Sequence, residues 1–83
     1  MANRQVTVGT TPTLLCSADP HDQTVLVHAG NDNVYIGNAS VTTSNGYRMD
    51  NKDKVTFPLG AYEALYGVTS TGTVTVYVYS EVN

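Results

Sequence analysis

The residue types that most often carry chemistry are sparse in this chain. Its one thiol, Cys16, lies in the apolar segment Thr13–Cys16, and its two imidazoles, His21 and His28, are seven positions apart. A thiol beside an imidazole can act as nucleophile and base, and Cys with His can bind zinc, but both sites need closer spacing or further ligands than this chain offers. We therefore expect no catalytic residue, and we interpret Cys16 as a small buried apolar side chain.

Two short acidic pairs, Asp19 with Asp22 and Asp50 with Asp53, could contact a calcium ion. Neither pair carries the dense run of oxygen ligands found in an EF-hand loop. The seven glycines are scattered over turns and strand ends and form no phosphate-binding cluster. We expect neither a metal nor a cofactor.

The charge of the chain also excludes classes of partner. Seven acidic and four basic residues give a net charge of −3, and the bases are too dispersed for the basic stripe that nucleic-acid binding requires. No long apolar run is present, so we expect neither a signal peptide nor a membrane span. The expectation is a soluble protein without a nucleic-acid or membrane partner.

The composition favours sheet. The chain has 12 Val, 12 Thr and 1 Ile, so 25 of its 83 residues are β-branched. Turn signals recur about every 8–12 residues, which is typical of a sandwich or barrel. We predict one all-β domain over residues 1–83, a small antiparallel β-sandwich or barrel of about seven short strands. So small a domain has a marginal core, which oligomerisation would support.

Alternating apolar residues place these strands. The predicted segments are Gln5–Val8, Thr13–Cys16, Thr24–Ala29, Val34–Gly37, Lys54–Phe57, Ala64–Val68 and Thr73–Tyr79, with Tyr47–Met49 as a further short strand. Apolar residues on both sides of Thr24–Ala29 indicate a central strand covered on both faces. The short turns suggest two hairpins, one formed by Thr24–Ala29 with Val34–Gly37 and one formed by the last two segments. Pro58 either ends pairing or marks an edge strand.

The last strand has a distinctive second face. Val74, Val76 and Val78 point to the core, so the residues between them share the opposite face, which is polar, aromatic and uncharged. Tyrosine supplies large contact area and a hydroxyl at low entropic cost, as protein interfaces require. An exposed strand without a partner would show the same pattern. The candidate interface residues are Tyr35, Thr75, Tyr77 and Tyr79, together with Arg4 and Gln5 from the N-terminus.

The short polar segment Met1–Gln5 has two interpretations. It could extend as a flexible arm over a neighbouring subunit, or it could be disordered, which is the commoner fate of such termini.

Several motifs occur in an order that resembles small β-rich virion proteins of tailed bacteriophages, of the head decoration type. They are Val6–Thr11 (VTVGTT), Val34–Gly37 (VYIG), Val41–Tyr47 (VTTSNGY), Ala64–Val68 (ALYGV) and Gly72–Val76 (GTVTV). The resemblance covers nearly the whole chain. It departs from the pattern at Asp50–Asp53, where a Gly-containing turn would be expected.

The resemblance implies a non-enzymatic structural protein on the capsid surface of the virion, assembled in the host cytoplasm. Its partner would be the major capsid protein, which it would bind as a homo-oligomer, with a trimer favoured, bridging neighbouring shell subunits. The alternative is a tail or fibre module in which the loops at residues 19–23 and 38–47 recognise a host glycan or surface protein.

Overall fold

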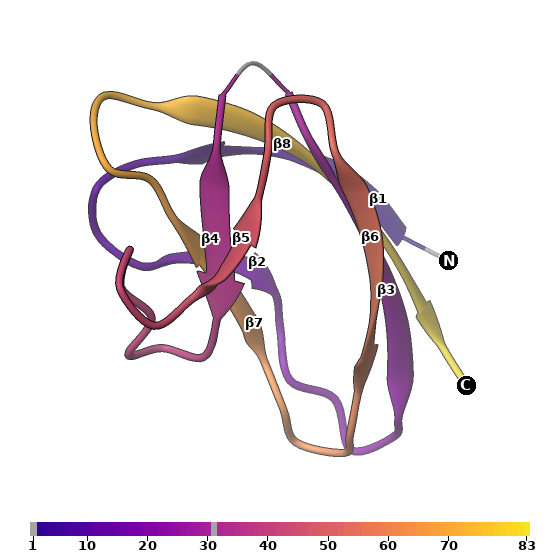
Figure 1. The fold of residues 1–83 in the computed structure, drawn as a ribbon. Helices are drawn as coiled ribbons and strands as arrows, with labels where there is room; N and C mark the ends of the chain where they lie inside the picture. The colour runs from indigo at the N-terminus through magenta and orange to yellow at the C-terminus, as the bar shows by residue number, and fades with distance from the viewer. Residues whose placement is uncertain (1, 31) are drawn as a thin grey trace.

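The computed structural model describes residues 2–30 and 32–83, which form two four-stranded antiparallel sheets and no helix (Figure 1). The strands are β1 (Ala2–Val8), β2 (Thr13–Cys16), β3 (Gln23–Ala29), β4 (Val34–Gly37), β5 (Tyr47–Met49), β6 (Lys54–Leu59), β7 (Leu65–Val68) and β8 (Val74–Val82). The predicted all-β sandwich is confirmed, with eight strands instead of about seven.

The strand order follows a simple rule. Sheet A has the order β1-β8-β3-β6, and sheet B has the order β2-β7-β4-β5. β1 pairs with β8, β2 with β7, β3 with β6 and β4 with β5, so the second half of the chain pairs in reverse order with the first half. Two further pairings, β3 with β8 and β4 with β7, join these pairs into sheets. Eight strands wound into two sheets in this order form a jelly roll.

Both predicted hairpins are wrong, because β3 and β4 lie in different sheets, as do β7 and β8. The connections that follow β3 and β7 cross between the sheets. The Gly30 amide donates to the Thr75 carbonyl oxygen at 2.9 Å, and Thr69 Oγ1 donates to the Asn33 carbonyl oxygen at 3.2 Å. The two crossings therefore support each other at one end of the sandwich.

The N-terminal segment is neither an arm nor disordered in the part that the structure describes. Ala2–Gln5 forms the first half of β1 and pairs with residues 77–80 of β8. Met1 lies outside the described residues. Arg4 and Gln5 consequently belong to a sheet.

The core lies between the two sheets. Sheet A contributes mainly valines and sheet B larger aliphatic residues, and the cluster includes Val8, Val25, Val27, Val74, Val76 and Val78 from sheet A and Leu15, Val34, Ile36, Met49 and Leu65 from sheet B. Cys16 is buried as predicted, and its thiol lies 3.4 Å from Gln23 Oε1. β3 is an inner strand of sheet A, but the expectation that both its faces are covered is wrong, since Leu26 is 37% exposed.

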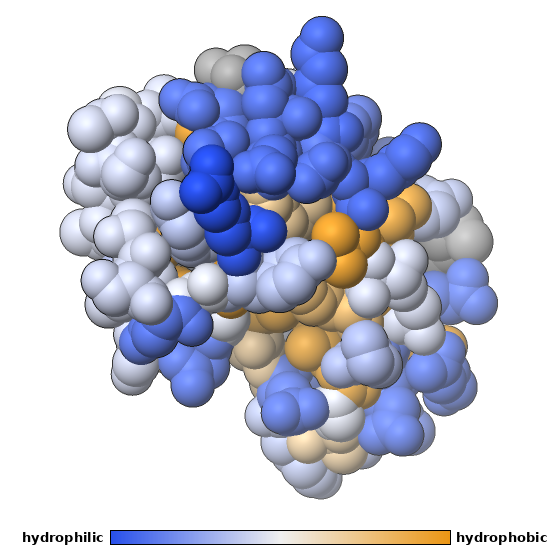
Figure 2. All heavy atoms as spheres, in the orientation of Figure 1, coloured by the Kyte–Doolittle hydropathy of each residue, from blue (hydrophilic) through white to orange (hydrophobic). Residues whose placement is uncertain are grey.

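One flank of the sandwich has apolar side chains at its surface. Figure 2 shows apolar surface in the middle of the view, between the strands that Figure 1 labels β5 and β6. Across this flank the rings of Tyr47 and Phe57 meet edge to face, with centroids 5.8 Å apart. β6 is an edge strand and contains Pro58, which confirms the edge interpretation of that proline.

Candidate interaction surface

Side chains on the outer face of sheet A form two rows that cross β1, β8 and β3. The rows follow from the strand register, which places one residue of each strand directly beside its neighbour. These six residues, here called the tyrosine face, are Gln5, Tyr77 and His28 in one row and Asn3, Tyr79 and Leu26 in the next. Because a sheet fixes these side chains at neighbouring positions, the surface is preformed.

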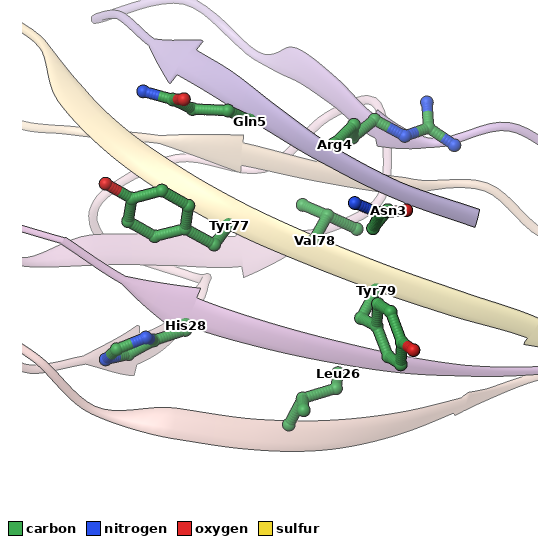
Figure 3. Close-up of a pocket in the computed structure, with 8 residues that line it drawn as sticks. All are labelled: Asn3, Arg4, Gln5, Leu26, His28, Tyr77, Val78 and Tyr79. Carbon is green, nitrogen blue, oxygen red and sulfur yellow. The ribbon is translucent and has the colours of Figure 1, made fainter. Parts of the chain in front are cut away.

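The tyrosine face is open to solvent, and its six residues include no Asp, Glu, Lys or Arg, although the rows continue into β6, where the exposed Lys54 lies directly beside His28. Tyr77 is 48% exposed, Tyr79 is 43% exposed, and both lie along a shallow groove of about 420 Å³ (Figure 3). The His28 ring lies 6.1 Å from the Tyr77 ring, tilted by 42°, and Figure 3 shows Leu26 beside Tyr79. Aromatic, aliphatic and amide groups thus alternate over one surface, as in the centre of a protein interface.

Four of the six predicted interface residues lie on this side of sheet A. Tyr77, Tyr79 and Gln5 belong to the tyrosine face, and Thr75 is half-buried two residues before Tyr77, at the preceding outward-facing position of β8. Arg4 alternates to the other side of β1, opposite Val78, and its exposed side chain points away from the tyrosine rings in Figure 3.

Tyr35 does not belong with the other tyrosines, because it lies on the outer face of sheet B. It is half-buried, and its Cβ is so close to Gly46 that a side chain there would collide with it. The 38–46 connection folds over this face and brings in Val41, which is 3% exposed, as is Val68, the β7 partner of Tyr35. Tyr35 therefore packs beneath a loop, and the face that it shares is partly covered.

Leu26, His28 and Asn3 complete the tyrosine face and were not predicted. The alternation of β3 shows that Leu26 and His28 oppose the valines of that strand. Their place beside Tyr79 and Tyr77 depends on the pairing of β3 with β8, which are separated by four other strands in the chain. No local signal predicts that pairing.

The thiol and the two imidazoles considered for catalysis lie in different parts of the structure. Cys16 is buried between the sheets, His28 lies on the outer face of sheet A, and His21 contacts Asp19 in the connection between β2 and β3. The backbone N–H of His21 donates to Asp19 Oδ1 at 2.9 Å, and this bond, with one from the His21 ring, lowers the pKa of the half-buried Asp19 carboxyl. The Tyr62 amide donates to the Asp19 carbonyl oxygen at 2.7 Å, so the connections after β2 and β6 lie together.

The acidic pair Asp50 and Asp53 has a structural role. Asp53 Oδ2 accepts a hydrogen bond from the Asp50 amide, and the Asp50 carbonyl oxygen accepts one from the Asp53 amide, which closes a tight turn with Lys52 at φ 65°. Within residues 2–30 and 32–83, no three His, Cys, Asp or Glu side chains cluster as metal ligands would. In the same ranges, no helix has the length and apolar character needed to cross a membrane.

No protein-family model, curated protein or solved structure matches this chain.

Proposed function

We propose that this chain is a non-enzymatic structural virion protein of a tailed bacteriophage, which decorates the capsid and stabilises it by binding across neighbouring shell subunits. The order of its sequence motifs supports this proposal. The jelly-roll order is compatible with it, because this architecture is common in viral capsid domains, although a fold alone does not define a function.

The observation that carries the proposal is the tyrosine face. Tyr77, Tyr79 and Leu26 expose a large aromatic and aliphatic area at the centre of a sheet, flanked by the amides of Asn3 and Gln5. A rigid surface of this kind loses little entropy on binding. Each contact with the major capsid protein can be weak, since several copies in a homo-oligomer bind together.

Attachment would also stabilise the bound protein. A ligand that binds only the native state adds to the free energy of unfolding, and an 83-residue domain benefits most from that gain. The same contacts bridge adjacent shell subunits, so rupture of the shell would have to break them.

The second candidate is a tail or fibre module that binds a host glycan. It is favoured by the same groove, because tyrosine rings beside amide side chains can stack on and hydrogen-bond to a sugar, and jelly rolls include lectin domains. In this version of the glycan-binding proposal, the binding surface is sheet A instead of the two loops proposed from the sequence. Those loops lie elsewhere, since residues 38–46 cover sheet B and Asp19 contacts Tyr62.

Copy number in purified particles separates the two candidates. Phage particles would be banded on a density gradient, and the ratio of this chain to the major capsid protein would be measured by mass spectrometry. Near-equal amounts support capsid decoration, and a few copies per particle support the tail or fibre module. Absence from the particles overturns both.

The double substitution Tyr77→Ala with Tyr79→Ala tests the surface. We expect it to abolish binding to shells built from the major capsid protein, since two adjacent aromatic anchors cost at least about 2 kcal/mol in an interface centre. Tyr62→Ala is the matched control, because Tyr62 is 77% exposed but lies in the connection between β6 and β7. Undiminished attachment of the double variant, measured by co-sedimentation, would remove the tyrosine face from the proposal.

A further inference from the structure

Each sheet ends in two edge strands, which present unpaired backbone N–H and C=O groups to solvent. In the described part of the chain these are β1 and β6 in sheet A and β2 and β5 in sheet B. Natural proteins usually protect such edges, because an open edge can pair with another chain.

Three of these edges are protected. β6 contains Pro58, which cannot donate to a ladder, and begins with Lys54. β2 has four residues, and its register shifts between Leu14 and Cys16. β5 has three residues. Short length, proline and register breaks all limit pairing with another chain.

β1 has neither the short length, the proline nor the register break of the other edges. It runs for seven residues in unbroken register with β8, from Ala2 opposite Ser80 to Val8 opposite Val74. It contains no proline or glycine, and Arg4 is its one charged residue. No strand in the described chain pairs with its other edge.

We propose that β1 pairs antiparallel with β1 of a second copy of this chain, about a two-fold axis at Gln5. In this register Gln5 lies opposite its own counterpart, Asn3 lies opposite the second copy's Thr7, and Arg4 lies opposite the second copy's Val6. Amides and hydroxyls then face one another on the outer side, and all seven residues of β1 take part.

The charge of Arg4 selects this arrangement. A two-fold axis at Arg4, or a parallel pairing in register, would place the two guanidinium groups side by side, which is unfavourable. With the axis at Gln5, the aliphatic stem of Arg4 covers Val6, which is half-buried in the single chain. The exposed guanidinium remains in water.

The pairing joins two copies of sheet A into one eight-stranded sheet. Because residues opposite one another share a face, both tyrosine faces lie on the same side and meet at Gln5. A two-fold contact of this kind closes at two copies. The expected assembly is therefore a dimer, instead of the trimer favoured from the sequence, and its existence does not depend on the virion role.

Charge substitutions at the two-fold axis test the register. Sedimentation equilibrium of the purified protein at low salt should show a concentration-dependent dimer. Gln5→Lys places two lysines opposite each other and should weaken the dimer about fivefold or more. An equal mixture of the Gln5→Lys and Gln5→Glu proteins should recover or exceed the wild-type association, because opposite charges then meet at the axis.

Thr56→Lys is the matched control, because it adds the same charge to an exposed outer-face position of the other edge strand, β6. It should leave the dimer unchanged, and circular dichroism should show every variant folded. A wild-type protein that stays monomeric at all concentrations overturns the proposal. So does a dimer that Gln5→Lys leaves intact, or one that the mixture fails to restore. Shell binding is measured separately, so this result and the fate of the proposed function are distinguishable.

Discussion

Gly30 marks the place where sheet A leaves no room for a side chain. Its amide donates to the carbonyl oxygen of Thr75 at 2.9 Å, directly after the last residue of β3. A Cβ on Gly30 would collide with that same backbone oxygen. The collision involves backbone, which cannot turn away as a flexible side chain can, so glycine is required by the close approach of two strands.

Gly30→Ala should therefore lower the free energy of unfolding by about 1–3 kcal/mol, the usual cost of overpacking. Gly9→Ala is the matched control, since nothing lies within 4 Å of the Cβ that it would add. That control should stay within about 0.5 kcal/mol of the wild type. Urea unfolding measures both, and equal stabilities for the two variants would contradict the steric argument.

The 38–46 connection acts as a structural element of its own. Val41 packs against the α-carbons of Gly37 and Gly46, both of which lack the side chain that would displace it. Val41 and Val68 are each 3% exposed, yet neither belongs to the main core cluster between the sheets. Both line the same hollow on the outside of sheet B, and we interpret them as a second apolar cluster that the connection covers.

Val41→Ala should destabilise the protein by about 1.5 kcal/mol, because two buried methyl groups are lost from this cluster. Val82→Ala removes the same groups from a side chain that is 49% exposed and should have little effect. Hydrogen exchange should show lost protection concentrated between residues 37 and 46. Protection lost evenly over the whole chain would mean that the connection is not a separate cluster.

Strands and their buried faces were predictable because alternation is a local property. Val74, Val76 and Val78 need only their own sequence to be assigned to one face. The partners of each strand were not predictable in this way. The short polar turns after Ala29 and Val68 carry the residues of a hairpin, but they carry the chain from one sheet to the other.

For the candidate surface, too, the sequence predicted which residues face outward but not which of them lie side by side. The alternation of β8 identified Tyr77 and Tyr79, and that of β4 identified Tyr35 as outward-facing. Alternation separates inside from outside but does not show to which sheet an outside residue belongs. For that reason Tyr35 was grouped with residues on the opposite sheet, and Leu26, which lies beside Tyr79, was missed.

On the scale of the whole molecule, nearly every pairing joins distant parts of the chain. Among the strands of residues 2–30 and 32–83, only β4 and β5 are both consecutive and paired, whereas β1 pairs with β8 and β3 lies between β8 and β6. Topologies dominated by such distant pairings fold slowly, because loop closure precedes the stabilising contacts.

Two buried valines test the order of folding. Val34 in β4 and Val8 in β1 are both fully buried, so truncation to alanine removes the same groups from equivalent environments. Val34→Ala should mainly slow folding, because the β4–β5 pair is local and forms early, whereas Val8→Ala should mainly speed unfolding. Stopped-flow chevron plots measure both rates. If Val8→Ala instead slowed folding and Val34→Ala sped unfolding, folding would begin at the β1–β8 pair.

The strand order also governs how the protein is made. The ribosome synthesises the chain from its N-terminus, so β8 is the last of the eight strands to emerge, yet in sheet A it lies between β1 and β3. Until β8 has left the exit tunnel, β1 has no partner strand, and the valines of both β1 and β3 face an unfinished core. Sheet A can close only after β8 has emerged, and until then the nascent chain is an apolar client for cellular chaperones.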